Sequence, residues 1–278
     1  MKIAGVVVLY NPGNDVMDNI KSYIDQIDRL YVVDNSDKKN QKLIALLKKD
    51  ERIKYLDNHG NRGIATALNV GAIHALKEGY DYLLTMDQDS SASEGMVENL
   101  VAYISTHPDE KLGIISAYQK RNDEKTCYYL KDYEQVLVIM TSGNLLNLRA
   151  YKKSGRFLDK LFIDRVDNEY CLRLNKNGYK VIRANKAILY HNLGKNVKVA
   201  GMSKILHNHI RLYYIVRNSL YLCKKYEKYF PDYIVQFRTE MLRAVRVNLI
   251  YGDHKIKQIC YVLRALFDYK CNRFGRVN

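Results

Sequence analysis

Proline, paired cysteines and long apolar runs are scarce in this sequence. Only three of the 278 residues are proline, which excludes an extended Pro-rich linker. The five cysteines include no C-x-x-C pair, which argues against a disulfide framework or a zinc cluster and favours a reducing compartment. No apolar stretch approaches the ~18 residues that a membrane-spanning helix needs. With 47% apolar and 27% charged residues, the composition is that of a folded globular protein.

Net charge is distributed unevenly along the chain. The whole sequence carries +15, but residues 1–194 contribute 28 basic against 25 acidic side chains, or +3, and residues 195–278 contribute 17 against 5, or +12. A surface this basic suits an anionic partner such as nucleic acid, acidic lipid or a phosphorylated substrate. We therefore expect a domain over residues 1–194 and a distinct basic helical region over residues 195–278.

Short apolar runs alternate with helical patterns through the first half. Ile3–Tyr10 is followed by turn residues without a small-residue cleavage site, and we interpret it as a buried first strand rather than a signal peptide. Further strands are predicted at 30–33, 53–56, 82–85, 112–117, 136–140, 181–182 and 188–190. Helices are predicted at 16–27, 40–50, 64–76, 167–177, 205–228, 231–251 and 254–272. This rhythm predicts an α/β fold with a mostly parallel sheet, helices on both faces and a C-terminal helical extension.

Ligands of such sheets bind beyond the carboxyl ends of the strands. That rule selects four segments as one edge of a pocket: Tyr10-Asn11, Asp34-Asn35, Asn58–Gly63 and Asp87–Asp89. They are far apart in the sequence, and only the fold would bring them together.

Asp87-Gln88-Asp89 ends a predicted strand. If the segment is extended, the two carboxylates point the same way and need a cation between them. Mg²⁺ or Mn²⁺, with diphosphate oxygens completing its shell, fits that requirement. The alternative is a capping role at the following helix, which the nearby serines could also fill.

Two other segments of this edge have both a structural and a functional interpretation. Asp34 is either a turn carboxylate or an acceptor for the ring N–H of uracil or thymine. Gly60–Gly63 opens a helix and is either a plain entry turn or a place where an anion meets the helix N-terminus. It is neither G-x-G-x-x-G nor a P-loop.

Together these segments resemble the consecutive blocks of the family 2 glycosyltransferases, which have the GT-A fold. The resemblance extends over roughly residues 3–220, and its tail is similar to the bacterial rhamnosyltransferase branch. The matching segments are Ile3–Pro12, Val32–Ser36, Asn61–Gly71, Asp87–Asp89, Thr141–Asn144, Phe162–Arg173, His191–Gly194 and Arg211–Asn218.

The resemblance implies roles for particular residues. Asp34 would read the pyrimidine, Asp87 would contact the ribose or the metal, and Asp89 would bind the metal. His191 would be a further metal ligand, unless it is an ordinary loop histidine. The donor site would comprise Tyr10, Asn11, Asp34, Asn61, Arg62, Gly63, Asp87 and Gln88. The acceptor and sugar cleft would comprise Ser142, Gly143, Asn144, Asp164, Glu169, Arg211, Tyr214 and Arg217.

Asp167 would be the catalytic base. Inverting transfer needs one carboxylate to take the proton of the attacking hydroxyl, while a metal stabilises the departing diphosphate. Asp164 and Glu169 compete for the role, and Asp167 also stands where a helix cap is favoured. Glu169 and Arg173, four residues apart, could form a supporting ion pair.

The basic tail has open alternatives. Ile256, Ile259, Cys260, Leu263 and Phe267 share one helical face, with Lys255, Lys257, Arg264 and Lys270 on others. Such a helix binds an anionic membrane, packs on its own domain or pairs with a second subunit in a homodimer. Arg211, Tyr214 and Arg217 would grip an acceptor diphosphate or serve ordinary helix packing.

The sequence therefore predicts an inverting, Mn²⁺- or Mg²⁺-dependent glycosyltransferase. The resemblance implies transfer of L-rhamnose from dTDP-L-rhamnose to a lipid-linked or polysaccharide acceptor, in the cytoplasm on the inner face of the cell membrane. Alternatives are another dTDP- or UDP-sugar, a sugar-phosphate nucleotidylyltransferase, a nucleic-acid-binding protein or an inactive relative. The nucleotidylyltransferase would need a basic grip near Tyr10–Gly13, and the nucleic-acid binder a recognisable motif, and neither is present.

Overall fold

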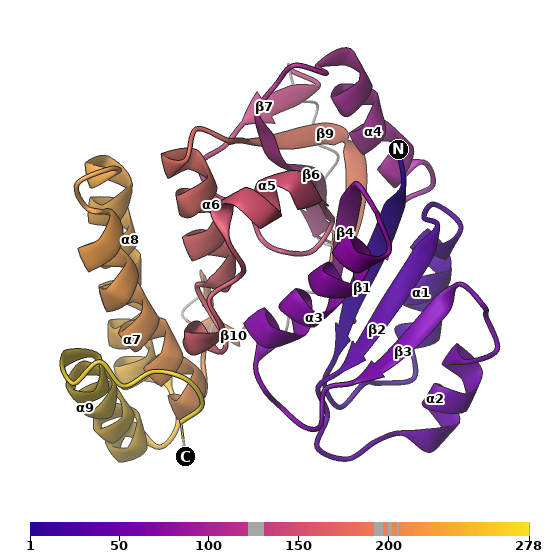
Figure 1. Cartoon of the computed structure of the whole chain (residues 1–278). Helices are drawn as coiled ribbons and strands as arrows, with labels where there is room; N and C mark the ends of the chain where they lie inside the picture. The colour runs from indigo at the N-terminus through magenta and orange to yellow at the C-terminus, as the bar shows by residue number, and fades with distance from the viewer. Residues whose placement is uncertain (122–130, 192–196, 200–201, 205, 278) are drawn as a thin grey trace. The chain divides into compact units, whose positions relative to one another are not determined.

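The computed structural model describes residues 1–121, 131–191, 197–199, 202–204 and 206–277 (Figure 1). The chain forms two compact units. Unit 1 comprises Met1–Phe157 and Tyr170–Asn192, and unit 2 comprises Leu158–Glu169 and Leu193–Asn278. The division predicted near residue 195 differs from these units in one respect, because Leu158–Glu169 groups with the C-terminal helices.

Unit 1 is built on a sheet whose N-terminal half is parallel. Its strands are β1 (Ile3–Leu9), β2 (Arg29–Asp34), β3 (Ile53–Asp57) and β4 (Tyr82–Asp87), in the spatial order β3-β2-β1-β4. Leu9 pairs with Asp34, and Val8 pairs with Asp87. The register therefore aligns the carboxyl ends of β1, β2 and β4 at one edge.

The other half of this sheet is mixed. It contains β5 (Ser90–Ala92), β6 (Leu112–Arg121), β7 (Tyr133–Gln135), β8 (Asn144–Asn147) and β9 (Lys180–His191). The order continues from β4 as β8-β6-β9-β5, with β8 antiparallel to both of its neighbours and β6 parallel to β9. β5 and β7 pair antiparallel with β9.

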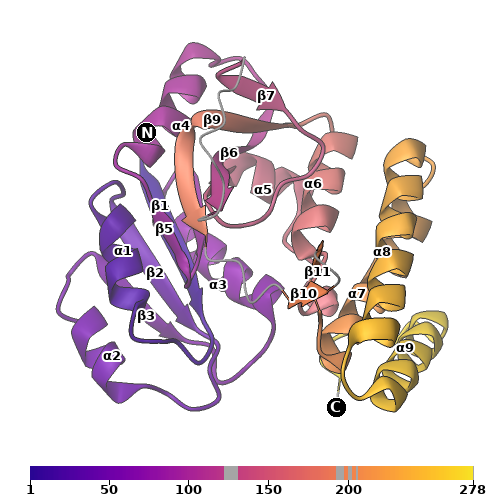
Figure 2. The ribbon, with the colours of Figure 1, turned by 180° about the vertical axis from the view of Figure 1, so that it is seen from behind.

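Helices cover both faces of the sheet of unit 1. They are α1 (Val16–Ile24), α2 (Gln41–Leu47), α3 (Ile64–Lys77), α4 (Met96–Thr106) and α5 (Leu148–Ser154). Apolar residues of α1, α2 and α4 form one core with the side chains of β1 that include Val7 and Leu9. On the other face, a Cβ added to Gly71 of α3 would lie 2.4 Å from Val6, so only glycine allows this close approach. Figures 1 and 2 show α3 and α1 on opposite sides of β1 and β2.

Unit 2 is helical. It contains η1 (Asp159–Leu161), the start of α6 (Val166–Lys176) and the antiparallel strands β10 (Val197–Val199) and β11 (Met202–Lys204). Its longer helices are α7 (His209–Tyr226), α8 (Pro231–Tyr251) and α9 (Lys255–Lys270). Both α8 and α9 pack on α7. Its core contains Phe162, Leu212, Tyr213, Tyr214, Val216, Met241 and Ala265. Within the described ranges, no helix combines the length and apolar character that crossing a membrane requires.

The structure confirms the α/β class, the helices on both faces and the C-terminal helices, and α8 has the predicted bounds. Two strand predictions are wrong in detail. No strand forms over residues 136–140; the nearest strand, β7, ends at Gln135. The strands predicted at 181–182 and 188–190 are parts of one 12-residue strand, β9.

Candidate functional site

The carboxyl ends of β1, β2 and β4 are joined by direct hydrogen bonds. The Tyr10 backbone N–H donates to Gln88 Oε1 at 2.8 Å, and Gln88 Nε2 donates to the Tyr10 carbonyl at 3.2 Å. The Asn11 N–H donates to Ser36 Oγ at 2.8 Å. Three of the predicted segments thus contact one another at this edge of unit 1, as the rule for parallel sheets requires.

Asp34 ends β2 and is 2% exposed. Its Oδ1 accepts from the Ser36 N–H and its Oδ2 from the Tyr55 hydroxyl, both at 2.8 Å. Lys39 Nζ lies 3.6 Å from Asp34 Oδ1 and 2.8 Å from Asp57 Oδ1. The hydrogen bond from Lys39 lowers the pKa of Asp57, and burial together with the bond to Asp34 raises the pKa of Tyr55. The Asp34 carboxylate is therefore fixed by donors on two sides.

Asn35 fixes the glycine-containing turn beside Asp34. Its Oδ1 accepts from Asn58 Nδ2 at 2.7 Å and from the Arg62 N–H at 3.2 Å, and its Nδ2 donates to the Gly63 carbonyl at 3.1 Å. The Gly63 N–H donates to Asn61 Oδ1 at 3.0 Å. Gly63 has φ +88°, which favours glycine, and α3 begins at the next residue. The predicted Asn61–Gly63 segment is therefore anchored to the end of β2.

The end of β4 carries the paired carboxylates. The Asp87 N–H donates to Ser142 Oγ at 3.0 Å, and the Gln88 carbonyl accepts from Asn19 Nδ2 at 2.9 Å. Asp87 is partly buried and Asp89 is exposed. Gln88 and Asp89 form the turn between β4 and β5, so the prediction that Asp87–Asp89 is an extended segment is wrong. The turn chemistry sets the position of Asp89, and strand alternation does not.

The predicted third metal ligand is His191. It is the last residue of β9 and pairs with Ser90 of β5, the residue after Asp89, while its side chain and Gly194 lie outside the described residues. Among the side chains that the structure describes, no group of three or more His, Cys, Asp or Glu residues is placed to hold a metal ion. Carboxylate oxygens like those of Asp87 and Asp89 are the kind of ligand that Mg²⁺ and Mn²⁺ prefer.

Ser142 and Gly143 form a buried turn before β8, and Asn144 is the first residue of that strand. The Gly143 N–H donates to the Thr85 carbonyl at 2.8 Å, and Asn144 Nδ2 donates to the Met140 carbonyl at 2.8 Å. Ser142 supports the backbone of Asp87, as described above. These contacts favour a structural role for Gly143 and Asn144 at the start of β8, and Ser142 contacts the backbone of Asp87.

In unit 2, the segment before α6 has an unusual backbone. Three non-glycine residues are left-handed: Phe162 (φ 66°), Asp164 (φ 59°) and Arg165 (φ 67°). Asn218 Nδ2 holds the segment by donating to the carbonyls of Leu161, Ile163 and Asp164 at 2.8–2.9 Å. Such conformations persist where the surroundings fix them, and they occur frequently at functional sites.

Asp167 lies in the first turn of α6. Its Oδ1 accepts from the Asn168 N–H at 2.8 Å. Burial raises the pKa of the Asp167 carboxyl, and the negative charge of Asp164 adds to this effect. The Asn168 N–H and the positive charge of Arg165 oppose it. A carboxyl with a raised pKa in its ionised form is a stronger base than an exposed aspartate.

The two competing carboxylates have charged partners within unit 2. Asp164 Oδ1 accepts from Arg211 Nε at 3.2 Å. Glu169 is completely buried, and its Oε1 accepts from Lys225 Nζ at 2.7 Å and from the Tyr226 hydroxyl at 2.8 Å. Glu169 therefore forms a partly buried ion pair that ties the start of α6 to α7.

Arg217, predicted to contact the acceptor, is 1% exposed. Its Nη1 donates to the Tyr213 hydroxyl at 3.1 Å and to the Gly275 carbonyl at 2.9 Å. Its Nη2 lies 3.3 Å and 3.4 Å from the carbonyls of Leu161 and Lys160. These bonds favour the helix-packing interpretation, in which Arg217 joins α7 to η1 and to the C-terminal segment.

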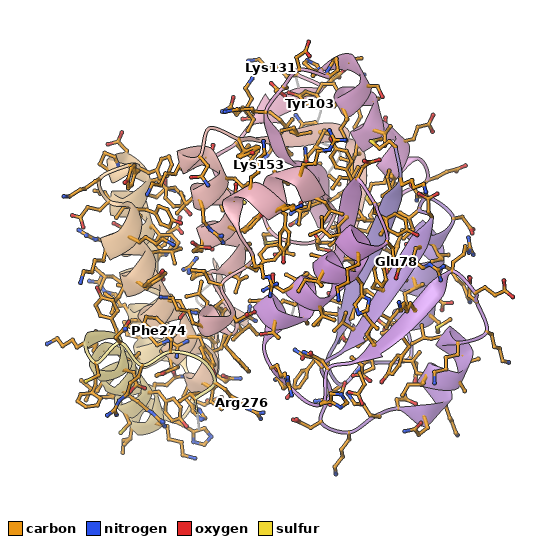
Figure 3. The ribbon with its side chains drawn as sticks, viewed as in Figure 1. Glu78, Tyr103, Lys131, Lys153, Phe274 and Arg276 are labelled. Atoms are coloured by element: carbon orange, nitrogen blue, oxygen red, sulfur yellow. The ribbon has the colours of Figure 1, made fainter. Side chains whose placement is uncertain are left out.

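Tyr214 has the same kind of environment. It is buried, and its hydroxyl accepts from the Val277 N–H at 2.7 Å. Phe274, from the segment after α9 (Figure 3), packs edge-on against Tyr221, and the Lys160 ammonium lies over both rings. The C-terminal segment thus completes the core of unit 2 around the predicted acceptor residues.

Two residues that contact Asp34 were not expected from the sequence. Lys39 and Tyr55 both contact this carboxylate, as described above. Strand alternation held a signal for Tyr55, because Asp57 pairs with Asp34 and Tyr55 shares a face with Asp57. For Lys39, which follows β2 in a loop, the sequence offers no comparable periodicity.

Solved structures with similar folds support the architecture. S. aureus TarS superposes with a TM-score of 0.64 at 14% identity over 97% of this chain. GalNAc-T7, crystallised with UDP, GalNAc and Mn²⁺, has a TM-score of 0.63 at 13% identity over 98% of this chain. The chain spans 48% of the TarS chain and 58% of the GalNAc-T7 chain. At these identities the likeness shows the fold, which is the GT-A fold.

Sequence comparisons give the family. The dTDP-rhamnosyl transferase RfbF of Shigella flexneri is 26% identical over 272 residues, which cover 92% of this chain and 90% of RfbF. The sequence model described as glycosyl transferase family 2 matches residues 6–157, more than half of the chain and the part that carries Asp34 and Asp87–Asp89. This chain belongs to glycosyl transferase family 2.

Proposed function

We propose that this glycosyltransferase transfers L-rhamnose from dTDP-L-rhamnose to a hydroxyl group of a lipid-linked or polysaccharide acceptor, with inversion at the anomeric carbon. The similarity to RfbF supports this choice of sugar and nucleotide. The observation that carries the proposal is the edge of unit 1 where Asp34, the Asn61–Gly63 turn and Asp87–Asp89 follow neighbouring strands. At one side of this edge, the Asp34 carboxylate is available to the pyrimidine ring of the donor. At the other side, Asp87 and Asp89 are available to a cation bound to the diphosphate.

In this proposal Asp34 accepts the ring N–H of the pyrimidine. Each carboxylate oxygen has two lone pairs, so both oxygens keep acceptor capacity beside their present donors. Because Asp34 is almost completely buried, the Lys39 or Tyr55 side chain must shift for the base to reach it. Tyr10, Asn11, Asn61 and Arg62 would line the nucleoside and diphosphate beside it.

Asp87 and Asp89 would hold Mg²⁺ or Mn²⁺ together with oxygens of the diphosphate, and His191 remains a predicted further ligand. Bound there, the ion supplies positive charge against the nucleoside diphosphate as it leaves. Gln88 fixes the loop after β1 through its bonds to Tyr10. Ser142 fixes the Asp87 backbone, so this part of the site is held before the donor binds.

Asp167 would take the proton of the acceptor hydroxyl as the oxygen attacks the anomeric carbon. The bond from that carbon to the diphosphate oxygen breaks, and the diphosphate leaves as an anion without needing a proton. Asp164 and Arg211, which bind each other, would lie on the acceptor side. Glu169 would hold the start of α6 through Lys225.

A panel of nucleotide sugars tests the proposed donor. The purified chain is titrated with dTDP-L-rhamnose, dTDP-glucose, UDP-glucose, UDP-GlcNAc and GDP-mannose, and binding is measured by calorimetry with Mn²⁺ present. The lowest Kd is expected for dTDP-L-rhamnose, and slow release of dTDP from this sugar should accompany binding. Preference for the GDP-sugar would contradict the assignment of a pyrimidine nucleotide. Tight binding of a UDP-sugar alone would show that this UDP-sugar, and not dTDP-L-rhamnose, is the donor.

Asp34→Asn is expected to raise the Kd for dTDP-L-rhamnose by roughly 10- to 30-fold, the value of one hydrogen bond to a charged acceptor. The turnover of the bound donor should change little, because the pyrimidine ring that Asp34 would contact is remote from the reacting carbon. Asn preserves the shape of the site, whereas Ala would leave the Tyr55 hydroxyl without its acceptor. The measurement is donor titration by calorimetry beside single-turnover transfer.

Asp57→Asn is the matched control for this variant. Asp57, like Asp34, pairs with Lys39, but it takes no part in the proposed contact with the pyrimidine ring. It should leave donor affinity within about twofold, well inside the range of a lost surface ion pair. Unchanged donor affinity in Asp34→Asn, with turnover reduced, would show that Asp34 acts elsewhere in the reaction.

A further inference from the structure

Helix α9 packs on the rest of unit 2 through a face that carries both polar and apolar residues. Its buried residues are Gln258, Ala265 and Asp268. Gln258 Nε2 donates to the His207 carbonyl at 3.1 Å, and the Tyr213 hydroxyl donates to Asp268 Oδ2 at 2.8 Å. The inward face of α9 is therefore fixed by hydrogen bonds in addition to apolar contact.

The opposite face of α9 is apolar and exposed. Ile256, Leu263 and Phe267 are 79%, 59% and 55% exposed, and Ile259 and Leu266 are also exposed. Their spacing of three and four residues places them in one continuous stripe along the helix. Single exposed apolar residues are ordinary, but a contiguous stripe marks an interaction surface. The described residues of unit 2 therefore leave this face of α9 uncovered.

Basic side chains border the stripe. Lys255, Lys257, Arg264 and Lys270 are all exposed. Asp268, the single acidic residue within α9, is buried, accepts from the Tyr213 hydroxyl and lies 3.6 Å from Arg264 Nε. Helical spacing puts Lys255 on one flank and Lys257 and Arg264 on the other. The outward surface of α9 thus combines an apolar centre with positive borders, which complements a layer of anionic headgroups over acyl chains.

We propose that α9 docks the chain on an anionic lipid bilayer. The apolar stripe enters the boundary between headgroups and acyl chains, and the flanking Lys and Arg side chains contact the headgroups. A second copy is disfavoured as the occupant, because facing α9 helices would bring their basic borders together in a chain of net charge +15. This docking is independent of the donor site and does not require the proposed sugar to be correct.

Vesicle binding by the full chain tests the proposal without any nucleotide sugar. Co-sedimentation is measured with vesicles of equal parts phosphatidylglycerol and phosphatidylcholine, and with phosphatidylcholine alone. Binding is expected to the anionic vesicles and to weaken with salt. Lys255→Gln with Lys257→Gln should weaken it roughly 30-fold, which corresponds to about 1 kcal/mol for each charge removed.

The matched charge control is Lys152→Gln with Lys153→Gln, two exposed lysines of α5 in unit 1 (Lys153 is labelled in Figure 3). It removes the same two charges and should leave binding nearly unchanged. Leu263→Gln with Phe267→Gln should weaken binding on the order of 100-fold, since each apolar side chain loses its burial. Leu46→Gln on α2, where Leu46 is 46% exposed, is the apolar control.

Two outcomes would overturn the proposal. One is vesicle binding that both α9 variants leave unchanged. The other is a dimer, seen by light scattering, that Leu263→Gln with Phe267→Gln converts to a monomer while the unaltered chain ignores vesicles. The second result would assign the stripe to a second copy. All the replaced side chains are exposed, so the substitutions are not expected to unfold the chain, and circular dichroism verifies this.

Discussion

Replacing Asp167 by Asn is expected to lower the rate of sugar transfer by about 10²–10⁴ while donor affinity is unchanged. Asn preserves the size of the side chain and can still accept from the Asn168 N–H, but it cannot take a proton from the acceptor hydroxyl. The proposed pyrimidine and metal ligands belong to unit 1 and are untouched. Single-turnover transfer, measured beside donor binding by calorimetry, separates the two effects.

Asp164→Asn is the control for the neighbouring carboxylates. Because Asp164 binds Arg211, this variant should reduce transfer less than Asp167→Asn does. Glu169→Gln is a poorer control, because it leaves Lys225 near a neutral group in a buried site and is expected to lower the free energy of unfolding. Near-normal transfer by Asp167→Asn together with an inactive Asp164→Asn would identify Asp164 as the base.

The pH profile gives a second readout of the same assignment. A base acts when deprotonated, so transfer is lost as the pH falls through the pKa of Asp167. Burial raises this pKa, which places the acidic limb of the profile at higher pH than an exposed aspartate would give. Removing the Asp164 charge lowers the pKa of Asp167, so Asp164→Asn should move the limb to lower pH. If Asp164→Asn leaves the pH of the acidic limb unchanged, the group that titrates there is another residue.

The parallel half of the sheet could be predicted because each of its strands can be recognised from a short stretch of sequence. Ile3–Leu9 is apolar on both faces, and each short apolar run is followed by polar turn residues and a helix. Once the strands are parallel and sequential, their carboxyl ends share an edge, so Asp34 and Asp87 come together without any knowledge of the contacts. The hydrogen bonds between Tyr10 and Gln88 agree with that reasoning.

The mixed half could not be predicted in the same way. β8 inserts antiparallel between β4 and β6, a pairing that joins residues about 60 positions apart in the sequence. β5 is three residues long and exists because it pairs with the end of β9. These strands depend on partners that a local pattern does not identify, and β5 is the reason that Asp89 lies in a turn.

Two features of unit 2 show where residue type alone misleads. Arg217 has the chemistry of a phosphate ligand, but its N–H groups bind carbonyls from η1 and from the C-terminal segment, which no spacing rule anticipates. Helical periodicity identified the apolar face of α9 but could not tell which side faced the core. Gln258 and Asp268 face inward because His207 and Tyr213 supply their partners.

Removal of divalent metal is expected to abolish transfer. A chelator should reduce activity to background, and Mn²⁺ or Mg²⁺ added in excess should restore it. The leaving group carries the charge of a nucleoside diphosphate, and this edge of unit 1 adds the carboxylates Asp87 and Asp89. Without a cation, these like charges would repel one another.

Asp89→Ala tests which residue holds the ion. Asp89 is exposed in the turn between β4 and β5, so its loss should not unfold unit 1. Donor affinity of the variant should no longer depend on Mn²⁺, and its transfer rate should fall to that of the chelated enzyme. Glu94→Ala, an exposed carboxylate five residues further along, is the matched control and should retain both properties. Full transfer in exhaustive chelator would remove the metal from the mechanism, and the charge of the departing diphosphate would then have to be met by basic side chains of the chain itself.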